Sequence, residues 1–133
     1  MSASAINRRT CPEGFAAARL AKANGFMEAA ELTMTFDEAI ELRDAYVSIW
    51  IHSGIASADH ICCKRLGEYH SSDDHNAAVA ILAEVDKQLA EQLRRLLRLK
   101  TKAGYSGAPA SADDGKVAKR AATRLLHAAR SHQ

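Results

Sequence analysis

Signals that begin an α-helix recur along this chain, and few residues between them would break one. Thr10 and Thr35 are each followed three residues later by Glu, and Ser111 is followed three residues later by Asp114. This spacing is typical of a capping box, in which each of the two side chains accepts a hydrogen bond from the other residue's backbone N–H. The chain holds 27 alanines against 2 prolines and 7 glycines, a balance that favours helix over strand.

These signals, together with the spacing of the apolar residues, predict five helices. Asp74, which ends a Ser-Ser-Asp-Asp run, and Asp86 are the expected N-caps of the third and fourth helices. Gly67 and Gly104 are the expected ends of the second and fourth helices. The predicted helices span about residues 12–34, 36–66, 75–84, 87–103 and 112–130.

The predicted fold class is all-α: an up-and-down bundle of about five helices, forming a single domain over residues 1–133. The helix at 36–66 is long and apolar around much of its circumference, so we expect it at the centre of the bundle. No stretch alternates apolar and polar residues with a period of two, which argues against strands.

The sequence shows neither a signal peptide nor a membrane span, because no apolar run approaches the roughly 20 residues that a span needs. We therefore expect a cytoplasmic protein that does not contact a membrane. The cysteines, Cys11, Cys62 and Cys63, are odd in number and two are adjacent, so we expect no disulfide framework. The histidines are scattered and no Cys-x-x-Cys pair exists, so we expect no metal site and no cofactor.

The formal net charge of +2 hides two regions of opposite sign. Residues 1–86 carry 7 Lys or Arg and 13 Asp or Glu, which gives −6, whereas residues 87–133 carry 11 and 3, which gives +8. The C-terminal third therefore has a positive field of its own, and such a field attracts anionic partners.

At about 100° per residue, basic side chains gather on one face of each of the last two predicted helices. This arrangement has two interpretations: a solvated face that keeps a small protein soluble, or a surface that binds the phosphates of RNA or of a nucleotide. Few aromatic side chains accompany the cations, which argues against a platform that stacks bases. The candidate nucleic-acid-binding residues are Arg94, Arg95, Arg98, Lys102, Lys116, Lys119, Arg120 and Arg130.

Two charged residues fall where apolar ones are expected. Lys100 lies in the leucine stripe of its helix, and Asp59 lies in an apolar stretch of the second helix. A buried charge needs a partner, so we consider a pairing between these two buried polar residues; alternatively, the Lys100 ammonium extends past the core to water. Ser48 and His52 share the face of Asp59, which is more typical of a polar seam along a long helix than of a catalytic triad.

Three segments of the chain resemble the HEPN domain (higher eukaryotes and prokaryotes nucleotide-binding), and within it a small stand-alone bacterial branch. They run from His52 to Gly67, from Asp74 to Leu82 and from Leu96 to Tyr105; the last is similar to the family's basic-x-x-Ala-x-Tyr signature. The resemblance covers roughly residues 15–130. It implies a helical bundle, often a homodimer, whose relatives include RNA-cleaving toxins of toxin–antitoxin pairs, phage-defence nucleases and non-catalytic nucleotide- or partner-binding modules.

The nucleases of this family carry an Arg-x4–6-His motif, and this chain holds the spacing twice. Arg120 and His127 lie two helical turns apart on the basic face and form the first candidate catalytic pair. Arg65 and His70 lie on either side of the Gly67 helix end and form the weaker pair. Metal-independent RNA cleavage needs a His as acid or base near a cation that holds the phosphate.

The resemblance and the basic face together predict a HEPN-like protein that binds RNA or a nucleotide, in a toxin-like or phage-defence role. A ribonuclease activity is left open and is not favoured. The alternatives are a non-catalytic helical interaction module, for which a nucleotidyltransferase-like antitoxin is the expected partner, and a plain homodimer without a nucleic-acid role.

Overall fold

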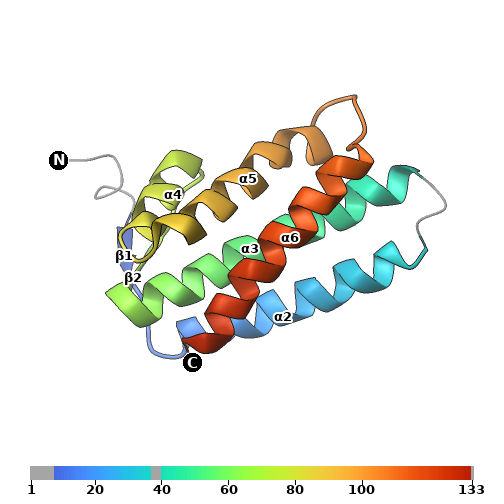
Figure 1. The fold of residues 1–133 in the computed structure, drawn as a ribbon. Coiled ribbons are helices and arrows are strands. Elements are labelled where there is room, and N and C mark those ends of the chain that lie inside the picture. Colours follow the sequence, from blue (N-terminus) through green and yellow to red (C-terminus); the bar gives the residue numbers. More distant parts are fainter. Residues whose placement is uncertain (1–7, 37–39, 133) are drawn as a thin grey trace.

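The structure is a computed structural model that describes residues 8–36 and 40–132. Within these residues the chain forms five α-helices and a sheet of two short strands (Figure 1). The prediction of an all-α helical bundle is confirmed. No described helix is long and apolar enough to cross a membrane. The elements in order are β1 (Arg8–Thr10), α2 (Phe15–Met34), α3 (Ile40–Leu66), β2 (Glu68–His70), α4 (His75–Ala83), α5 (Lys87–Gly104) and α6 (Ala112–Ser131).

The helix α3 lies at the centre of the bundle, as its apolar circumference predicts. It packs along α2, α5 and α6, whereas α4 rests mainly on α5. Figure 1 shows α6 running between α5 and α2, with α4 and both strands gathered where α3 ends. Val47, Trp50, Ala56 and Ile61 of α3 are fully buried, and they belong to one cluster of buried apolar side chains. Removal of this apolar surface from water is the main force that holds the helices together.

Three helix starts carry the caps that the sequence predicts. Asp74 caps α4 and Asp86 caps α5, each side chain accepting backbone N–H groups of the first turn. In α6, Ser111 Oγ accepts from Asp114 N at 3.0 Å and Asp114 Oδ2 accepts from Ser111 N at 2.8 Å, which completes the capping box. Gly67 follows the end of α3 with a left-handed φ of +73°, the conformation that ends many helices.

The predicted N-cap at Thr10 is wrong. Thr10 belongs to β1, and α2 begins only at Phe15, after a left-handed Gly14 with φ of +82°. The chain ahead of the helix is held in an extended conformation because Cys11 N donates a hydrogen bond to Gly67 O at 2.9 Å. A tertiary contact therefore overrides the local capping signal.

The predicted helix start at Thr35 is only partly described. Its Oγ1 donates a hydrogen bond to Leu32 O at 2.6 Å, so this side chain helps to end α2. Glu38, the acid of the expected box, lies outside the described residues, and α3 is described from Ile40 onward.

A disulfide joins Cys11 to Cys63, which corrects the expectation from the cysteine count. Cys62 is the free cysteine and is buried. Only Cys63 of the adjacent pair is bonded to Cys11, and the fold decides which of the two is used. Beside the disulfide, β1 and β2 pair antiparallel with Arg8 opposite His70. Strands of three residues are too short to show a period of two, so the sequence analysis missed them.

Candidate functional site

The predicted nucleic-acid-binding residues lie on the outer sides of α5 and α6. Seven of the eight are exposed, and Lys102 is half-buried. The two helices pack against each other, so the two groups of cations belong to neighbouring elements. We call these eight residues the α5–α6 basic set: Arg94, Arg95, Arg98, Lys102, Lys116, Lys119, Arg120 and Arg130.

Acidic side chains neutralise only part of the positive charge on these helices. Glu91 forms ion pairs with Arg94 and Arg95, and Asp114 Oδ2 lies 2.8 Å from Lys102 Nζ. The hydrogen bond from Lys102 holds the pKa of Asp114 below its usual range. Six cations make neither an ion pair nor a side-chain hydrogen bond with the rest of the described chain: Lys87, Arg98, Lys116, Lys119, Arg120 and Arg124.

The basic set does not converge on a single cleft. Arg94 and Arg98 line a hollow between α4 and α5. On α6, Lys116, Lys119 and Arg130 line two other hollows, both beside α2. Because α6 runs between α5 and α2, these cations border different parts of the surface (Figure 1). An extended polyanion can contact cations in several of these places at once, whereas a small ligand can contact only those that border one hollow.

The two candidate catalytic pairs are not assembled into a site within this chain. Arg120 and His127 share the exposed side of α6, but His127 lines the hollow beside α2 and Arg120 is not part of that lining. Arg65 is exposed at the end of α3, whereas His70 lies on β2 and lines a different cavity. Arg65 and His70 therefore belong to different elements, on either side of Gly67.

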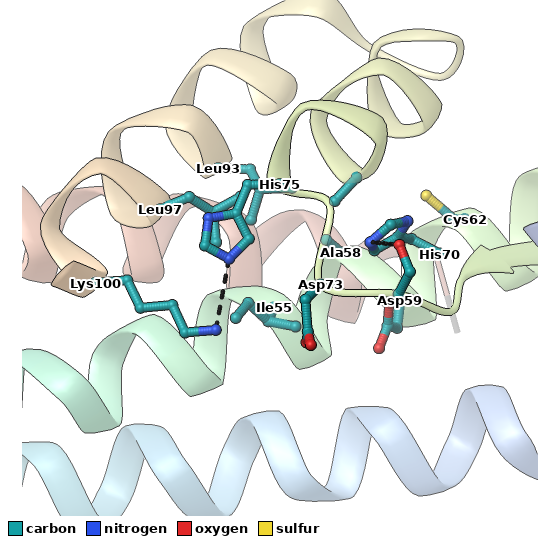
Figure 2. A pocket seen from close by; sticks show the side chains of 12 residues that line it. Ile55, Ala58, Asp59, Cys62, His70, Asp73, His75, Leu93, Leu97 and Lys100 are labelled. Carbon is teal, nitrogen blue, oxygen red and sulfur yellow. Dashed lines mark hydrogen bonds between the residues drawn. The ribbon is translucent and has the colours of Figure 1, made fainter. Parts of the chain in front are cut away.

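The cavity that contains His70 brings together ionisable side chains from several elements (Figure 2). It has a volume of about 160 Å³ and lies between α3, α4 and α5. Figure 2 shows His75 and Lys100 toward one end, and Asp59, His70 and Cys62 toward the other. Its apolar lining is Ile55, Ala58, Ala78, Leu93 and Leu97, and its polar lining is Asp59, Cys62, His70, Ser72, Asp73, His75 and Lys100.

Asp59 is paired with an arginine of α2. Its Oδ2 accepts a hydrogen bond from Arg19 Nε at 2.9 Å, and the two side chains are only 15% and 20% exposed. Of the two alternatives considered for Lys100, the pairing with Asp59 is not formed, because Arg19 of α2 is the cation that pairs with this carboxylate. Burial raises the pKa of Asp59 to about 6, and the nearby Arg19 charge opposes this shift only in part.

Lys100 enters the cavity from α5 without meeting an acid. Its Nζ lies 3.5 Å from Nε2 of His75, and no described carboxylate lies within ion-pairing distance of it. Lys100 is half-buried beside the buried Leu96 and Leu97, which confirms its place along the leucine stripe. For Lys100 to donate to His75, Nε2 must be the unprotonated ring nitrogen, so this contact requires a neutral imidazole.

The other end of the cavity holds two uncharged side chains, His70 and Cys62, beside Asp59. Burial lowers the pKa of His70 and so favours its neutral form. His70 Nε2 lies 3.4 Å from Ser72 Oγ, and Nδ1 is buried with no hydrogen-bond partner in the described part of the chain. Burial, reinforced by the Asp59 charge, raises the pKa of the Cys62 thiol to about 12, which keeps it protonated and unreactive.

A second hollow of about 270 Å³ shares Lys100 with the lining of the cavity. Ser48, His52 and Tyr105 contribute its other polar groups. Ser48, His52 and Asp59 share one face of α3; the first two line this hollow and Asp59 lines the cavity, so the predicted polar seam borders both. Burial, followed by the charges of Lys100 and Arg19, lowers the pKa of His52.

The sequence analysis did not name Arg19, Cys62, Ser72, Asp73 or His75 as site residues. The residues around Arg19 in the sequence give no indication that it pairs with Asp59, forty residues later. The three segments that resemble the HEPN domain do contain a signal, because Asp59, His75 and Lys100 come from one segment each and line the same cavity. Only the tertiary structure shows that these segments meet.

The described residues contain no group of three or more His, Cys, Asp or Glu side chains placed to hold a metal ion. Comparison of the chain with protein-family models, with curated proteins and with solved structures finds no match.

Proposed function

We propose that this protein binds RNA through the phosphates, using the exposed cations of α5 and α6. The observation that supports this most directly is the group of six cations on these helices that no described acid neutralises. Cations without acidic partners can neutralise phosphates. This neutralisation releases the counterions condensed on the nucleic acid, and that release drives most non-specific binding.

The distribution of these cations favours a polymer over a small ligand. They follow the outer sides of two packed helices and border separate hollows, so a chain of phosphates can contact several at once. Tyr105, at the end of α5, is the only aromatic side chain on these two helices or the loop between them. Base stacking therefore contributes little, and we expect weak dependence on RNA sequence.

The test is the salt dependence of binding to a single-stranded polyuridylate oligomer, measured by fluorescence anisotropy. The variant Lys119→Gln/Arg120→Gln/Arg124→Gln removes three unpaired cations of α6. The slope of log affinity against log salt is expected to decrease by about 2, because each lost phosphate contact on a single strand contributes about 0.7.

A matched control removes the same charge elsewhere. Arg9, Lys22 and Lys64 are exposed and lie on β1, α2 and α3, so Arg9→Gln/Lys22→Gln/Lys64→Gln lowers the net charge equally. We expect its slope to stay within about 0.5 of the wild type. Equal losses in both variants would show that only net charge matters. A flat slope for the wild type would overturn the proposal and favour an interaction module.

We propose that the protein binds RNA without cleaving it, because the Arg and the His of each candidate pair do not line the same hollow of the chain. Pure folded protein is therefore expected to leave the RNA intact after prolonged incubation. Cleavage that is abolished by His127→Ala and by Arg120→Ala would instead establish a ribonuclease. The homodimer and the nucleotidyltransferase-like partner stay predictions, and sedimentation of the purified chain, alone and with that partner, tests both.

A further inference from the structure

We propose that the cavity between α3, α4 and α5 binds a small zwitterionic molecule of the amino-acid class, with its carboxylate at Lys100 and its ammonium at Asp73. The observation that supports this is that Lys100 and Asp73 line the same cavity and neither forms an ion pair with a described residue. This site shares no residue with the α5–α6 basic set, so it does not depend on RNA binding.

The cation end of the cavity lacks an anion. Lys100 is half-buried, and among the described residues its only polar contact is the 3.5 Å approach to His75 Nε2. A partly desolvated ammonium gains far more from a carboxylate than from a neutral imidazole at that distance. His52 shares the adjoining hollow with Lys100, and its side chain adds a second nitrogen to this end of the groove.

The acid end needs a cation or N–H donors. Asp59 already holds Arg19, but Asp73, at the exposed mouth of the cavity, makes no ion pair or side-chain hydrogen bond with the described chain. Lys100 does not supply this cation, because the two side chains are farther apart than ion-pairing distance. A ligand with both charges can span the gap that the protein's own side chains leave open.

The middle of the cavity fits a short apolar body. Ile55, Leu93 and Leu97 contribute apolar surface to its lining. Figure 2 shows Ile55 between Lys100 and Asp73. The volume of about 160 Å³ is below the range of about 300–1,000 Å³ that holds drug-sized ligands, so a whole nucleotide is too large for it. A purely apolar ligand would leave both charges without partners, and a simple anion would meet the two carboxylates. The zwitterion satisfies both ends.

The experiment is calorimetric titration of the full chain with 5-aminopentanoate, pentanoate and pentylamine, which carry both charges, the carboxylate alone and the ammonium alone. We expect the zwitterion to bind at least tenfold more tightly than either analogue. Lys100→Met should reduce its advantage over pentylamine to less than about threefold, and Asp73→Asn should do the same for its advantage over pentanoate.

The controls are Lys87→Met and Glu13→Gln, which remove one exposed charge of each sign outside the cavity. Both should leave all three affinities within twofold of the wild type. Lys100→Arg keeps the positive charge and should retain the preference, which separates loss of the site from loss of the fold. The proposal is overturned if the three compounds bind alike, if none binds at millimolar concentration, or if the controls lose as much as the cavity variants.

Discussion

Asp59 Oδ2 lies 2.9 Å from Arg19 Nε, and this ion pair ties the C-terminal half of α3 to the first turns of α2. Both side chains are largely buried, so the carboxylate is desolvated at the same time as it is paired. Desolvation has the larger effect, since the pKa of Asp59 rises to about 6 from its ordinary value of 3.8.

The first prediction concerns the pH dependence of stability. Because the carboxyl group binds its proton more tightly in the folded state, its contribution to stability is fully present below pH 3.8 and is lost as pH rises to about 6. At about 1.4 kcal/mol per pKa unit, the loss is on the order of 3 kcal/mol. Relative to Asp59→Asn, the wild type should therefore lose stability between about pH 4 and 6 and then level off.

Urea unfolding of wild type, Asp59→Asn and Glu41→Gln at intervals from pH 4 to 8 measures this difference. Glu41 is exposed at the start of α3, so its variant should follow the wild-type curve. A constant offset between wild type and Asp59→Asn at every pH would contradict the raised pKa.

The second prediction concerns the disulfide. Cys11–Cys63 closes a loop with a sequence separation of 52, so it restricts the unfolded chain strongly. The chain-entropy relation gives a contribution of about 4 kcal/mol to the free energy of unfolding. Reduction of the native protein should lower stability by an amount of this order. Thiol counting should find one free thiol in the unfolded, unreduced protein and three after reduction.

Two variants keep the redox test specific. Cys11→Ser should be as unstable as the reduced protein and should not respond to reductant. Cys62→Ala keeps the disulfide and should still respond. Three free thiols in the unreduced protein would show that the bond does not form.

The third prediction uses two glycines that lie in helices. A Cβ at Gly54 of α3 would meet Leu96 Cδ1 at 2.2 Å and Leu125 Cδ1 at 3.3 Å. Both leucines are completely buried and have little room to move, so Gly54→Ala should destabilise the protein by about 1–3 kcal/mol. Gly25 of α2 has nothing within 4 Å, so Gly25→Ala should instead stabilise it by about 0.5–1 kcal/mol. Thermal unfolding of each variant measures whether its stability rises or falls. Stabilisation by both substitutions would show that the close packing at Gly54 is not present.

The fourth prediction concerns the capping box of α6. Ser111→Ala removes the acceptor for Asp114 N and should cost about 1 kcal/mol of stability. Thr123→Ala, at an exposed position within the same helix, should change stability by less than about 0.5 kcal/mol. Chemical unfolding compares the two. An equal effect of both variants would mean that the cap does not hold the helix start.

Much of the fold is determined by local chemistry. The caps Asp74, Asp86 and Ser111 begin helices because their side chains bond backbone groups only two or three residues away, and such contacts can be predicted from spacing alone. The solvent-facing positions of the cations follow from helical periodicity for the same reason. The prediction at Thr10 was wrong where a contact from a distant segment competed with the local signal.

The contacts of Asp59 and Lys100 could not be predicted from local sequence. Charge and periodicity identified Asp59 and Lys100 as residues that need partners; Asp59 has one in Arg19, whereas Lys100 meets no described acid. Their actual neighbours, Arg19 and His75, are set by which helices pack against α3 and α5. An ion pair or hydrogen bond acts over a few ångströms, so the sequence by itself determined the helices, their faces and the charges they carry. Only the tertiary structure decided which charges meet, which cysteine is bonded, and which charged groups are left facing an open cavity.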